Sequence, residues 1–386
     1  MLNRRMVLSG VVIAFLLGVG FLAQFGGSGG VVRTYYIAAD EVVWQYADDG
    51  TNRMTGEAFR EHELMFAEPG PHHIGRVAKK AVYREYTDST FTTLVERPAE
   101  WQHLGILGPL IRAEVGDTIR IVFRNNASFP ASMHPHGVFY DKDSEGAAYE
   151  DGTPAVMRAD DGVPTGGTHV YVWPVPERAG PTEHEGSTSF WMYHSHVNEV
   201  RDVNSGLIGP MVITRRGMAR PDGSPRDIDR EVVASLLEFD ENSSWYVEEN
   251  VRSYAQRPDE VQFQRSPFGD HATIPAFGSF FKETINGKFY GHLPGLTMRV
   301  GERVRWYVMA NTNFEIHAPH WHGNVVTVNM MRTDVAALLP MGMLVADMEP
   351  DNEGTWLFHC HVAAHLRMGM QAFYRVEPAE ALVALR

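Results

Sequence analysis

The sequence contains a single cysteine, Cys360, among its 386 residues, and it has no basic cluster. One cysteine cannot form a disulfide within the chain, so the fold must be stabilised by its hydrophobic core and by any metal that it binds. A net charge of −14 argues against a nucleic-acid partner. The hydrophobic content of 44% and the charged content of 21% are ordinary for a globular protein.

The N-terminus carries an apolar run over residues 6–25, with Arg4 and Arg5 before it and a glycine-rich segment after it. This order is typical of an export signal or a signal anchor, and the run is about long enough to span a bilayer. The paired arginines resemble a twin-arginine export signal. We therefore predict that residues 1–30 are an export signal or membrane anchor with a Gly linker, and that the protein is exported to the periplasm or another extracytoplasmic compartment.

The rest of the chain repeats one pattern. Residues 114–137 and 299–323 each contain a Val-Gly-acid turn, a strand of alternating apolar and polar residues, an Asn-containing turn and a final H-x-H-G. Further along, residues 190–197 (FWMYHSHV) match residues 355–362 (TWLFHCHV). Two matched blocks in the same order indicate two homologous domains.

Alternation with period two recurs over residues 118–123, 231–237 and 303–308, and the 36 Gly and 22 Pro suit many short strands joined by turns. We predict an all-β protein made of two Greek-key β-sandwich domains. The first domain spans residues 31–217 and the second spans residues 226–378, with a Gly/Pro-rich linker between them.

Histidines occur in four H-x-H pairs, although 18 histidines would give about one such pair by chance. Residues i and i+2 of a strand point the same way, so each pair presents two imidazoles on one face. A single pair would be interpreted as solvated or core histidines, but four pairs at matched repeat positions predict a metal cluster. Imidazole suits copper, zinc, iron and nickel, so the pairs alone do not name the metal. The pairs are His134/His136, His194/His196, His320/His322 and His359/His361.

Cys360 identifies the metal as copper. It lies between His359 and His361, with His365 five residues later, Met370 five beyond that, and His317 upstream. Two His and one Cys with a weak axial Met form the ligand set of blue electron-transfer copper. A structural zinc site would not need the Met, and an inert buried thiol would not need the flanking His. We interpret Cys360, His359 and His361 as the catalytic link between an electron-accepting copper and the histidine cluster.

The first domain lacks this blue site. Aligning the two repeats puts Ala131, Ser195, Val200 and Ser205 at the positions of the four blue-copper ligands of the second domain. The first domain therefore contributes only cluster ligands.

The motifs HPHG, HSH, HAPHWH and HCHVAAHLRMGM resemble those of the multicopper oxidases, and residues 33–377 look like the ceruloplasmin–hephaestin branch. The resemblance implies cupredoxin-like domains, four copper ions per chain, and four one-electron oxidations coupled to the reduction of O2 to water. It assigns the type 1 copper to His317, Cys360, His365 and Met370, the type 2 copper to His134 and His320, and the type 3 pair to His136, His194, His196, His322, His359 and His361.

The resemblance also implies an assembly. Ceruloplasmin looks like six such domains in a ring, and a two-domain chain can reproduce that ring only as a homotrimer with clusters at its subunit interfaces. Residues 158–161 further resemble a calcium site, for which Asp160 and Asp161 would supply carboxylates. A solvated acidic loop is the alternative.

The one-electron donor is left open among a phenol, Cu(I) and Fe(II). Ala364 and Glu283 stand where ferroxidase members of the family carry an acidic residue and an iron-binding His, which weighs against Fe(II). Methionines around the blue site would favour Cu(I), although they also suit a sandwich core. The six methionines are Met330, Met331, Met341, Met343, Met348 and Met368.

Two other classes remain as alternatives. A copper nitrite reductase-like enzyme needs only three cluster-side histidines, and a metal-free binding module would not need the complete ligand set. An oxidase would also need a carboxylate that delivers protons to the cluster. The candidates are Asp141, Glu199 and Asp202.

Overall fold

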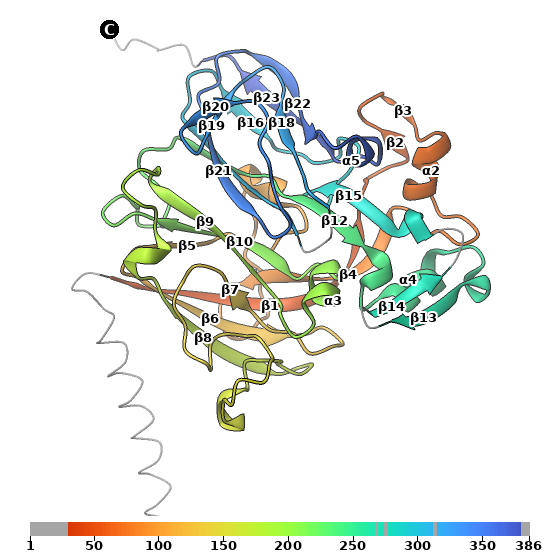
Figure 1. The fold of residues 1–386 in the computed structure, drawn as a ribbon, viewed down its shortest axis with the longest axis horizontal. Coiled ribbons are helices and arrows are strands. Elements are labelled where there is room, and N and C mark those ends of the chain that lie inside the picture. The colour runs from red at the N-terminus through yellow and green to blue at the C-terminus, as the bar shows by residue number, and fades with distance from the viewer. Residues whose placement is uncertain (1–29, 267–268, 274–276, 312–314, 380–386) are drawn as a thin grey trace, which may run out of the picture.

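A computed structural model describes residues 30–266, 269–273, 277–311 and 315–379. The first domain, in the lower part of Figure 1, consists of two four-stranded sheets. The first sheet has the order β4 (Val77–Tyr86), β1 (Val32–Gln45), β6 (Thr118–Asn125) and β8 (Thr168–Pro174). The second has the order β5 (Ile111–Glu114), β10 (Ile208–Thr214), β9 (Thr188–His194) and β7 (His134–Pro135).

The second domain, in the upper part of Figure 1, has matching sheets. The first sheet has the order β11 (Arg230–Val233), β17 (Val304–Met309), β21 (Met343–Met348), β19 (Val326–Val328) and β20 (Met331–Thr333). The second has the order β16 (Thr297–Arg299), β23 (Gln371–Glu377), β22 (Gly354–Cys360) and β18 (Pro319–Trp321). The parallel pair β5–β10 corresponds to β16–β23, so the repeat seen in the sequence is a repeat of topology.

Short elements surround the two sandwiches. The small sheets pair β2 (Thr51–Asn52) with β3 (Glu57–Ala58), β12 (Leu236–Asp240) with β15 (Phe281–Ile285), and β13 (Gln262–Ser266) with β14 (Gly269–Thr273). The helices are α2 (Glu61–Ala67), α3 (Glu199–Asn204), α4 (Val247–Tyr254) and α5 (Ala363–Arg367). Turns of 3-10 helix are η1 (Ala99–Leu104), η2 (Ala155–Met157), η3 (Glu177–Ala179), η4 (Glu241–Ser243), η5 (Pro258–Glu260) and η6 (Phe277–Phe280).

Alternation in the sequence explains the sandwich strands. In β6 every second residue is buried, so Ile119, Ile121 and Phe123 point into the core of the first domain. Burying such a side chain contributes about 1.5–3 kcal/mol relative to leaving it exposed. The predicted all-β fold with two cupredoxin domains is confirmed, whereas the predicted domain boundaries stay a prediction.

The alternation over residues 231–237 does not correspond to one strand. The chain leaves β11 after Val233 and enters β12 at Leu236, and β12 pairs with β15 in a separate two-stranded sheet. Leu236 keeps one bridge to Ala310, just after β17. Asn286 causes the break, because its side-chain oxygen accepts a hydrogen bond from the Ser235 backbone at 2.6 Å. Its amide nitrogen donates to the Val233 carbonyl at 2.7 Å.

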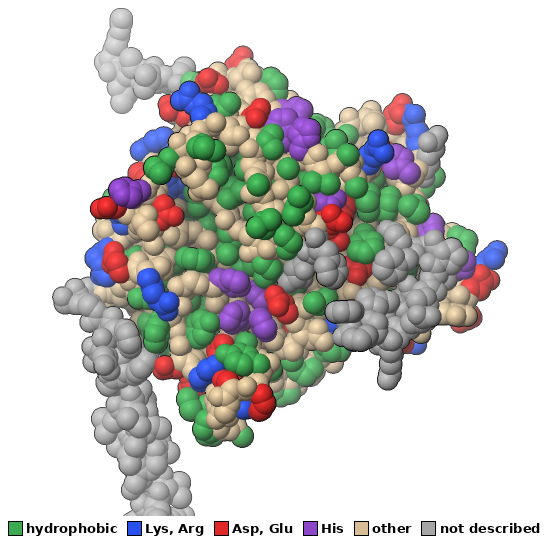
Figure 2. All heavy atoms as spheres, in the orientation of Figure 1, with side chains coloured by type: hydrophobic (Ala, Val, Ile, Leu, Met, Phe, Trp, Pro, Cys, Tyr) green, Lys and Arg blue, Asp and Glu red, His purple; other side chains and the backbone are tan. Residues whose placement is uncertain are grey.

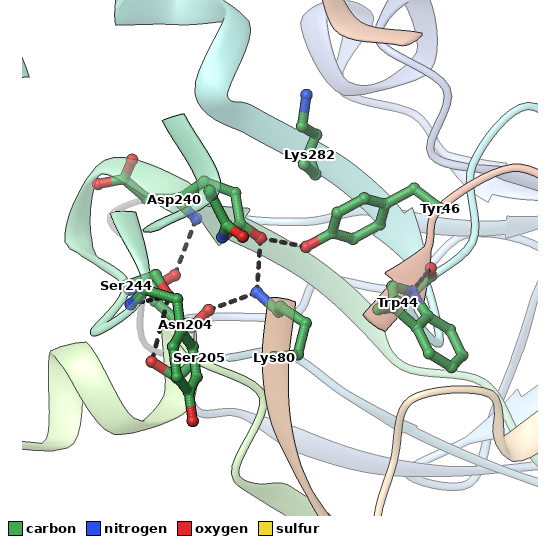
Figure 3. Close-up of polar contacts among 12 residues, drawn as sticks. Trp44, Tyr46, Lys80, Asn204, Ser205, Asp240, Ser244 and Lys282 are labelled. Carbon is green, nitrogen blue, oxygen red and sulfur yellow. Dashed lines mark hydrogen bonds and ion pairs between the residues drawn. The ribbon is translucent and has the colours of Figure 1, made fainter. Parts of the chain in front are cut away.

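A buried ionic network joins the two domains (Figure 3). The Lys80 ammonium on β4 donates to Glu241 Oε1 and to the Asn204 carbonyl, each at 2.6 Å, and Tyr46 donates its hydroxyl to the same carboxylate. Lys80 and Glu241 are both fully buried. Removing one member would leave a buried charge without its partner, which costs about 3–5 kcal/mol.

The predicted export signal lies almost entirely within residues 1–29, outside the described residues. Among the helices that are described, none is long and apolar enough to cross a bilayer.

Candidate copper centres

Strand β22 separates the thiol from the imidazoles, as expected from its alternation. Cys360 points into the core of the second domain together with Phe358. His359 and His361 lie on the other face, with ring centroids 5.5 Å apart. The backbone of three consecutive residues therefore connects a buried sulfur site to a histidine site.

The predicted type 1 ligands come together around Cys360. Its Sγ lies 3.4 Å from His365 Nδ1 and 3.8 Å from His317 Nδ1, and all three side chains are buried. His365 is positioned by α5, which starts just after β22, and His317 by a bridge to Leu338. Met370 is fully buried in the same core cluster and is tied to the strand, because its carbonyl accepts from the Cys360 backbone at 3.2 Å.

The chemistry of this group fits copper. Burial and the neighbouring His365 lower the pKa of His317 to about 3, so its imidazole is neutral and can act as a ligand. Burial raises the pKa of the Cys360 thiol, so its thiolate needs a cation to stabilise it. One neutral thiol can become a ligand here only when a metal replaces its proton.

The four cluster histidines of the second domain form one group. His320 lies opposite His359 in the β18–β22 register. His359 Nε2 is 3.1 Å from His320 Nδ1 and 3.0 Å from His322 Nε2, and the ring of His361 lies 5.2 Å from that of His320. Burial followed by these neighbours lowers the pKa of His359 to about 4, which keeps it available as a neutral ligand.

The first domain repeats this arrangement. His134 lies opposite His194 in the β7–β9 register, and His136 Nε2 is 3.1 Å from His194 Nε2. The Glu145 carbonyl accepts from His134 Nδ1 at 2.7 Å, which fixes that ring and leaves its Nε2 for a ligand. His196 completes the group, 5.2 Å from His134 between ring centroids.

Each of these groups is half of the predicted cluster. Among the described residues, the ring contacts join histidines within a group and not between groups. Figure 2 shows histidine gathered at two separate places on one face, one over β7 and one beside β18 and β22. The sequence predicted the members of the cluster, and the fold of one chain keeps its two halves apart.

A carboxylate group lies beside His365. Glu238 on β12 faces Glu283 on β15 in the strand register, and one oxygen of each lies within 4.8 Å of the other and of a His365 ring nitrogen. Burial and then Glu315 and Asp240 raise the pKa of Glu238 to about 7. Burial followed by Glu238 and Glu315 raises the pKa of Glu283 well above its usual range.

Sequence reasoning missed this group because it treated Glu283 only as the loss of a histidine. The signal was present at Glu238, a charged residue in the apolar run Leu236, Leu237, Glu238, Phe239. Like charges directly opposite each other on paired strands are unfavourable unless a proton or a cation lies between them.

Comparisons with known proteins agree with this geometry. Two family models, both described as "Multicopper oxidase", match residues 86–217 and 255–380, together more than half of the chain.

The chain belongs to the multicopper oxidase family.

Its relatives include hephaestin of Rattus norvegicus, 40% identical over 353 residues, and "Ferroxidase HEPHL1" of Homo sapiens, 42% identical over 361 residues. Human ceruloplasmin is 37% identical over 346 residues. The alignments cover 90%, 92% and 89% of this chain but 30%, 30% and 31% of those proteins. The chain therefore spans less than a third of the length of these relatives.

Solved structures support the fold. The multicopper oxidase mgLAC matches with a TM-score of 0.54 at 18% identity, over 92% of this chain and 90% of that chain. A blue copper oxidase from Nitrosomonas europaea matches with a TM-score of 0.52 at 17% identity, over 90% and 86% of the two chains.

The candidate proton carriers of this multicopper oxidase lie in different surroundings. Glu199 Oε2 is 3.5 Å from His196 Nε2, next to the histidines of the first domain. Asp141 is exposed. Asp202 is fully buried, and both of its carboxylate oxygens accept hydrogen bonds. A further carboxylate, Asp334, lies 3.7 Å from His320 and had not been expected.

The predicted calcium ligands Asp160 and Asp161 lie in a loop beside β8. Asp160 is fully buried, and Oδ2 accepts from the Gly146 backbone at 2.8 Å. Its Oδ1 has no hydrogen-bond partner among the described residues. Asp161 is half-buried, and burial followed by Asp160 raises its pKa.

The methionines do not form one group at the blue site. Met348 is buried in the core of the second domain, whereas Met330 and Met331 are exposed at the β19–β20 turn. Met341 and Met343 pack against the hydrophobic cluster that spans the two domains. Met341, Met343 and Met348 therefore pack against the hydrophobic clusters, whereas the exposed Met330 and Met331 do not.

Proposed function

We propose that this chain is the subunit of a multicopper oxidase that oxidises a reduced metal cation, Fe(II), one electron at a time and reduces O2 to water. His317, Cys360, His365 and Met370 would hold the type 1 copper. Bound copper would supply the one-electron chemistry at this position and the four-electron reduction of O2 at the cluster. The type 2 copper would be held by His134 and His320, and the type 3 pair by His136, His194, His196, His322, His359 and His361.

One observation carries the choice of donor: Glu238 and Glu283 face each other within 4.8 Å of a His365 nitrogen. Carboxylate oxygens prefer hard cations to soft Cu(I), and an apolar phenol would gain nothing from two buried acids. The glutamates would bind the cation and hold it against the imidazole that leads to Cys360. Glu315, close enough to raise the pKa of both glutamates, would attract it from solvent.

A cation site at Glu238 and Glu283 weakens the argument against Fe(II) that Ala364 and Glu283 had suggested. At both positions this chain lacks the residue that ferroxidase members use. Glu283 would nevertheless bind a cation together with Glu238. Three relatives that carry the names hephaestin, ferroxidase and ceruloplasmin add support, although this chain spans less than a third of their length.

The donor is tested by O2 uptake with Fe(II), Cu(I) and a phenol in parallel. We expect Fe(II) to be preferred, and Glu283→Gln or Glu238→Gln to raise the KM for Fe(II) by about tenfold or more, as the loss of about 1.4 kcal/mol of binding energy would. Phenol oxidation and blue absorbance should not change. The exposed Glu349, replaced by Gln, is the control. A preference for the phenol, or unchanged Fe(II) kinetics in both variants, would overturn the choice of donor.

We further propose that the enzyme is a homotrimer whose clusters form where the first domain of one copy meets the second domain of the next. Among the described residues, the histidines of each half-cluster contact one another and not those of the other half. A second copy of the chain would therefore supply the missing half. Three copies of a chain that spans 30% of hephaestin approach the length of that relative. Light scattering should give three times the mass of the chain.

Export through the N-terminal segment remains part of this proposal, because Arg4 and Arg5 precede an apolar run over residues 6–25. Fractionation of cells that express the full chain tests it. Calcium at Asp160 and Asp161 is likewise proposed, on the ground that Asp160 Oδ1 is buried without a hydrogen-bond partner among the described residues. Metal analysis that finds four copper ions and one calcium ion per chain would support both metal assignments.

A further inference from the structure

The first domain preserves the surroundings of a blue copper site although it lacks the ligands. Ser195 occupies the position of Cys360. The backbone N–H of Ser132 donates to Ser195 Oγ at 3.1 Å, just as the backbone N–H of Ala318 donates to Cys360 Sγ at 3.4 Å. The two domains therefore share one backbone framework around a thiol in one case and a hydroxyl in the other.

A buried carboxylate lies beside that hydroxyl in the first domain. Asp202 is on α3, the helix that corresponds to α5 with its ligand His365. Asp202 Oδ2 accepts from Ser195 Oγ at 2.6 Å and from the backbone N–H groups of Val197 at 3.1 Å and Asn198 at 3.0 Å. A carboxylate with several donors forms strong, charge-assisted hydrogen bonds that fix its neighbours.

The same contacts control the orientation of the cluster histidines. Ser195 lies between His194 and His196, so anchoring its hydroxyl fixes the end of β9 from which both imidazoles project. Ser132 Oγ accepts from the His196 backbone at 3.0 Å, and Ser132 lies two residues before His134. Asp202, Ser195 and Ser132 thus connect both H-x-H motifs of the first domain.

The second domain supports this connection from the other side. The Trp245 indole N–H donates to Asp202 Oδ1 at 2.8 Å. Next to it, Ser244 Oγ and Ser205 Oγ lie 3.2 Å apart, a contact that links the end of α3 to the segment after η4 (Figure 3). Both oxygens of Asp202 are therefore occupied, and its position is fixed by both domains.

We propose that Asp202 is a positioning residue for the copper ligands of the first domain. It does with hydrogen bonds what a bound copper would do in the second domain, and it holds His194 and His196 ready for the cluster before any metal arrives. The inference rests on the proposed cluster. Residues that orient metal ligands commonly change metal affinity by about 10- to 100-fold when replaced.

The test is copper binding by Asp202→Asn, which keeps the shape and removes the charge. We expect the type 2 EPR signal and the near-ultraviolet band of the type 3 pair to require about 10- to 100-fold more free copper, set by a competing chelator. The blue absorbance should appear at the same copper concentration as in the unmodified protein. Asp202→Glu should recover part of the loss, because it keeps the carboxylate.

Asp117→Asn is the matched control. Asp117 is a buried carboxylate of the same domain that accepts from Arg33 Nε at 2.6 Å and from the backbone of Val31 and Glu114 at 2.9 Å, in contacts that do not involve the cluster histidines. It should lower the free energy of unfolding and leave cluster loading unchanged. If it weakens cluster copper as much as Asp202→Asn does, Asp202 acts only through stability and the proposal is wrong.

Should Asp202→Asn not fold, Ser195→Ala and Trp245→Phe each remove one of its hydrogen bonds. We expect both to shift cluster loading in the same direction by a smaller factor, and unchanged loading in both would overturn the proposal. An unmodified protein that binds no cluster copper would instead refute the proposed function. The two failures are therefore distinguishable.

Discussion

The separation of the half-clusters can be tested by complementation between two inactive variants. His136→Ala removes a predicted type 3 ligand from the first domain, and His322→Ala removes its repeat equivalent from the second. Each variant alone should be inactive, because every cluster then lacks a ligand. When both chains are produced in one cell, an interface between an intact first domain and an intact second domain gives a complete cluster.

The expected recovery follows from the geometry. If the cluster lies between copies and the chains mix at random, about half of the first domains and about half of the second domains are intact, so about a quarter of the interfaces are complete. If both halves came from one chain, no mixture of these variants would contain a complete cluster. The electron-accepting site should not limit recovery, since both variants keep Cys360, His317 and His365.

A second pair of chains separates the two models more clearly. Unmodified chain produced with the double variant, His136→Ala and His322→Ala together, should also give about a quarter of full activity for an interface cluster, but about half for a cluster within one chain. The measurement is O2 uptake per blue copper at equal expression of the two chains, which carry the same tag so that trimers of every composition are recovered. The interface model, and with it the trimer, would be refuted by two results together. The mixture of the two single variants would show no activity, and the mixture of unmodified chain with the double variant would show about half of full activity.

Three further predictions concern single residues. Cys360→Ser should abolish blue absorbance and turnover while the type 2 EPR signal persists; turnover that survives would contradict the electron route through β22. Burial lowers the pKa of Lys282 to about 7, so between pH 7 and about 10.5 the unfolded state holds the proton that the folded state has released, and stability rises with pH across that window. Lys282→Met should therefore raise the free energy of unfolding, by about 2–4 kcal/mol at pH 6 and by less at pH 10. Denaturant titrations at the two pH values measure this gain, and a gain that does not depend on pH would contradict the explanation. Gly105→Ala should lower stability by about 2–4 kcal/mol, because its Cβ would lie 2.1 Å from the Asn286 carbonyl oxygen, whereas Gly166→Ala, with similar positive φ and open space, should cost only about 1 kcal/mol in the same titrations.

Local patterns predicted a large part of this molecule. The alternation of His359, Cys360 and His361 fixed which side chains share a face, since that depends only on the pleat of one strand. The repeated blocks likewise predicted paired sandwiches, and β7–β9 and β18–β22 indeed align His134 with His194 and His320 with His359. Five residues after Cys360, a helix shorter than two turns is enough to bring His365 back to the thiol.

Features that depend on distant strands could not be predicted in this way. The alternating segment over residues 231–237 divides between two strands, and the Asn286 side chain, about fifty residues later, bonds to the chain at the break. The register of β12 against β15 then brings Glu238 opposite Glu283. Glu283 alone had suggested a lost iron ligand, whereas the pair beside His365 suggests a cation site.

The sequence by itself predicted the candidate ligands, the repeat and the fold class, because these depend on spacing along single strands and on alternation that any sandwich must satisfy. Only the tertiary structure decided which carboxylates meet His365, that Asp202 accepts a hydrogen bond from Ser195 in the first domain, and that the two halves of the cluster lie apart in one chain. Those outcomes depend on how separate strands align and how two domains pack, and the free energies that set such contacts are shared among many residues far apart in the chain.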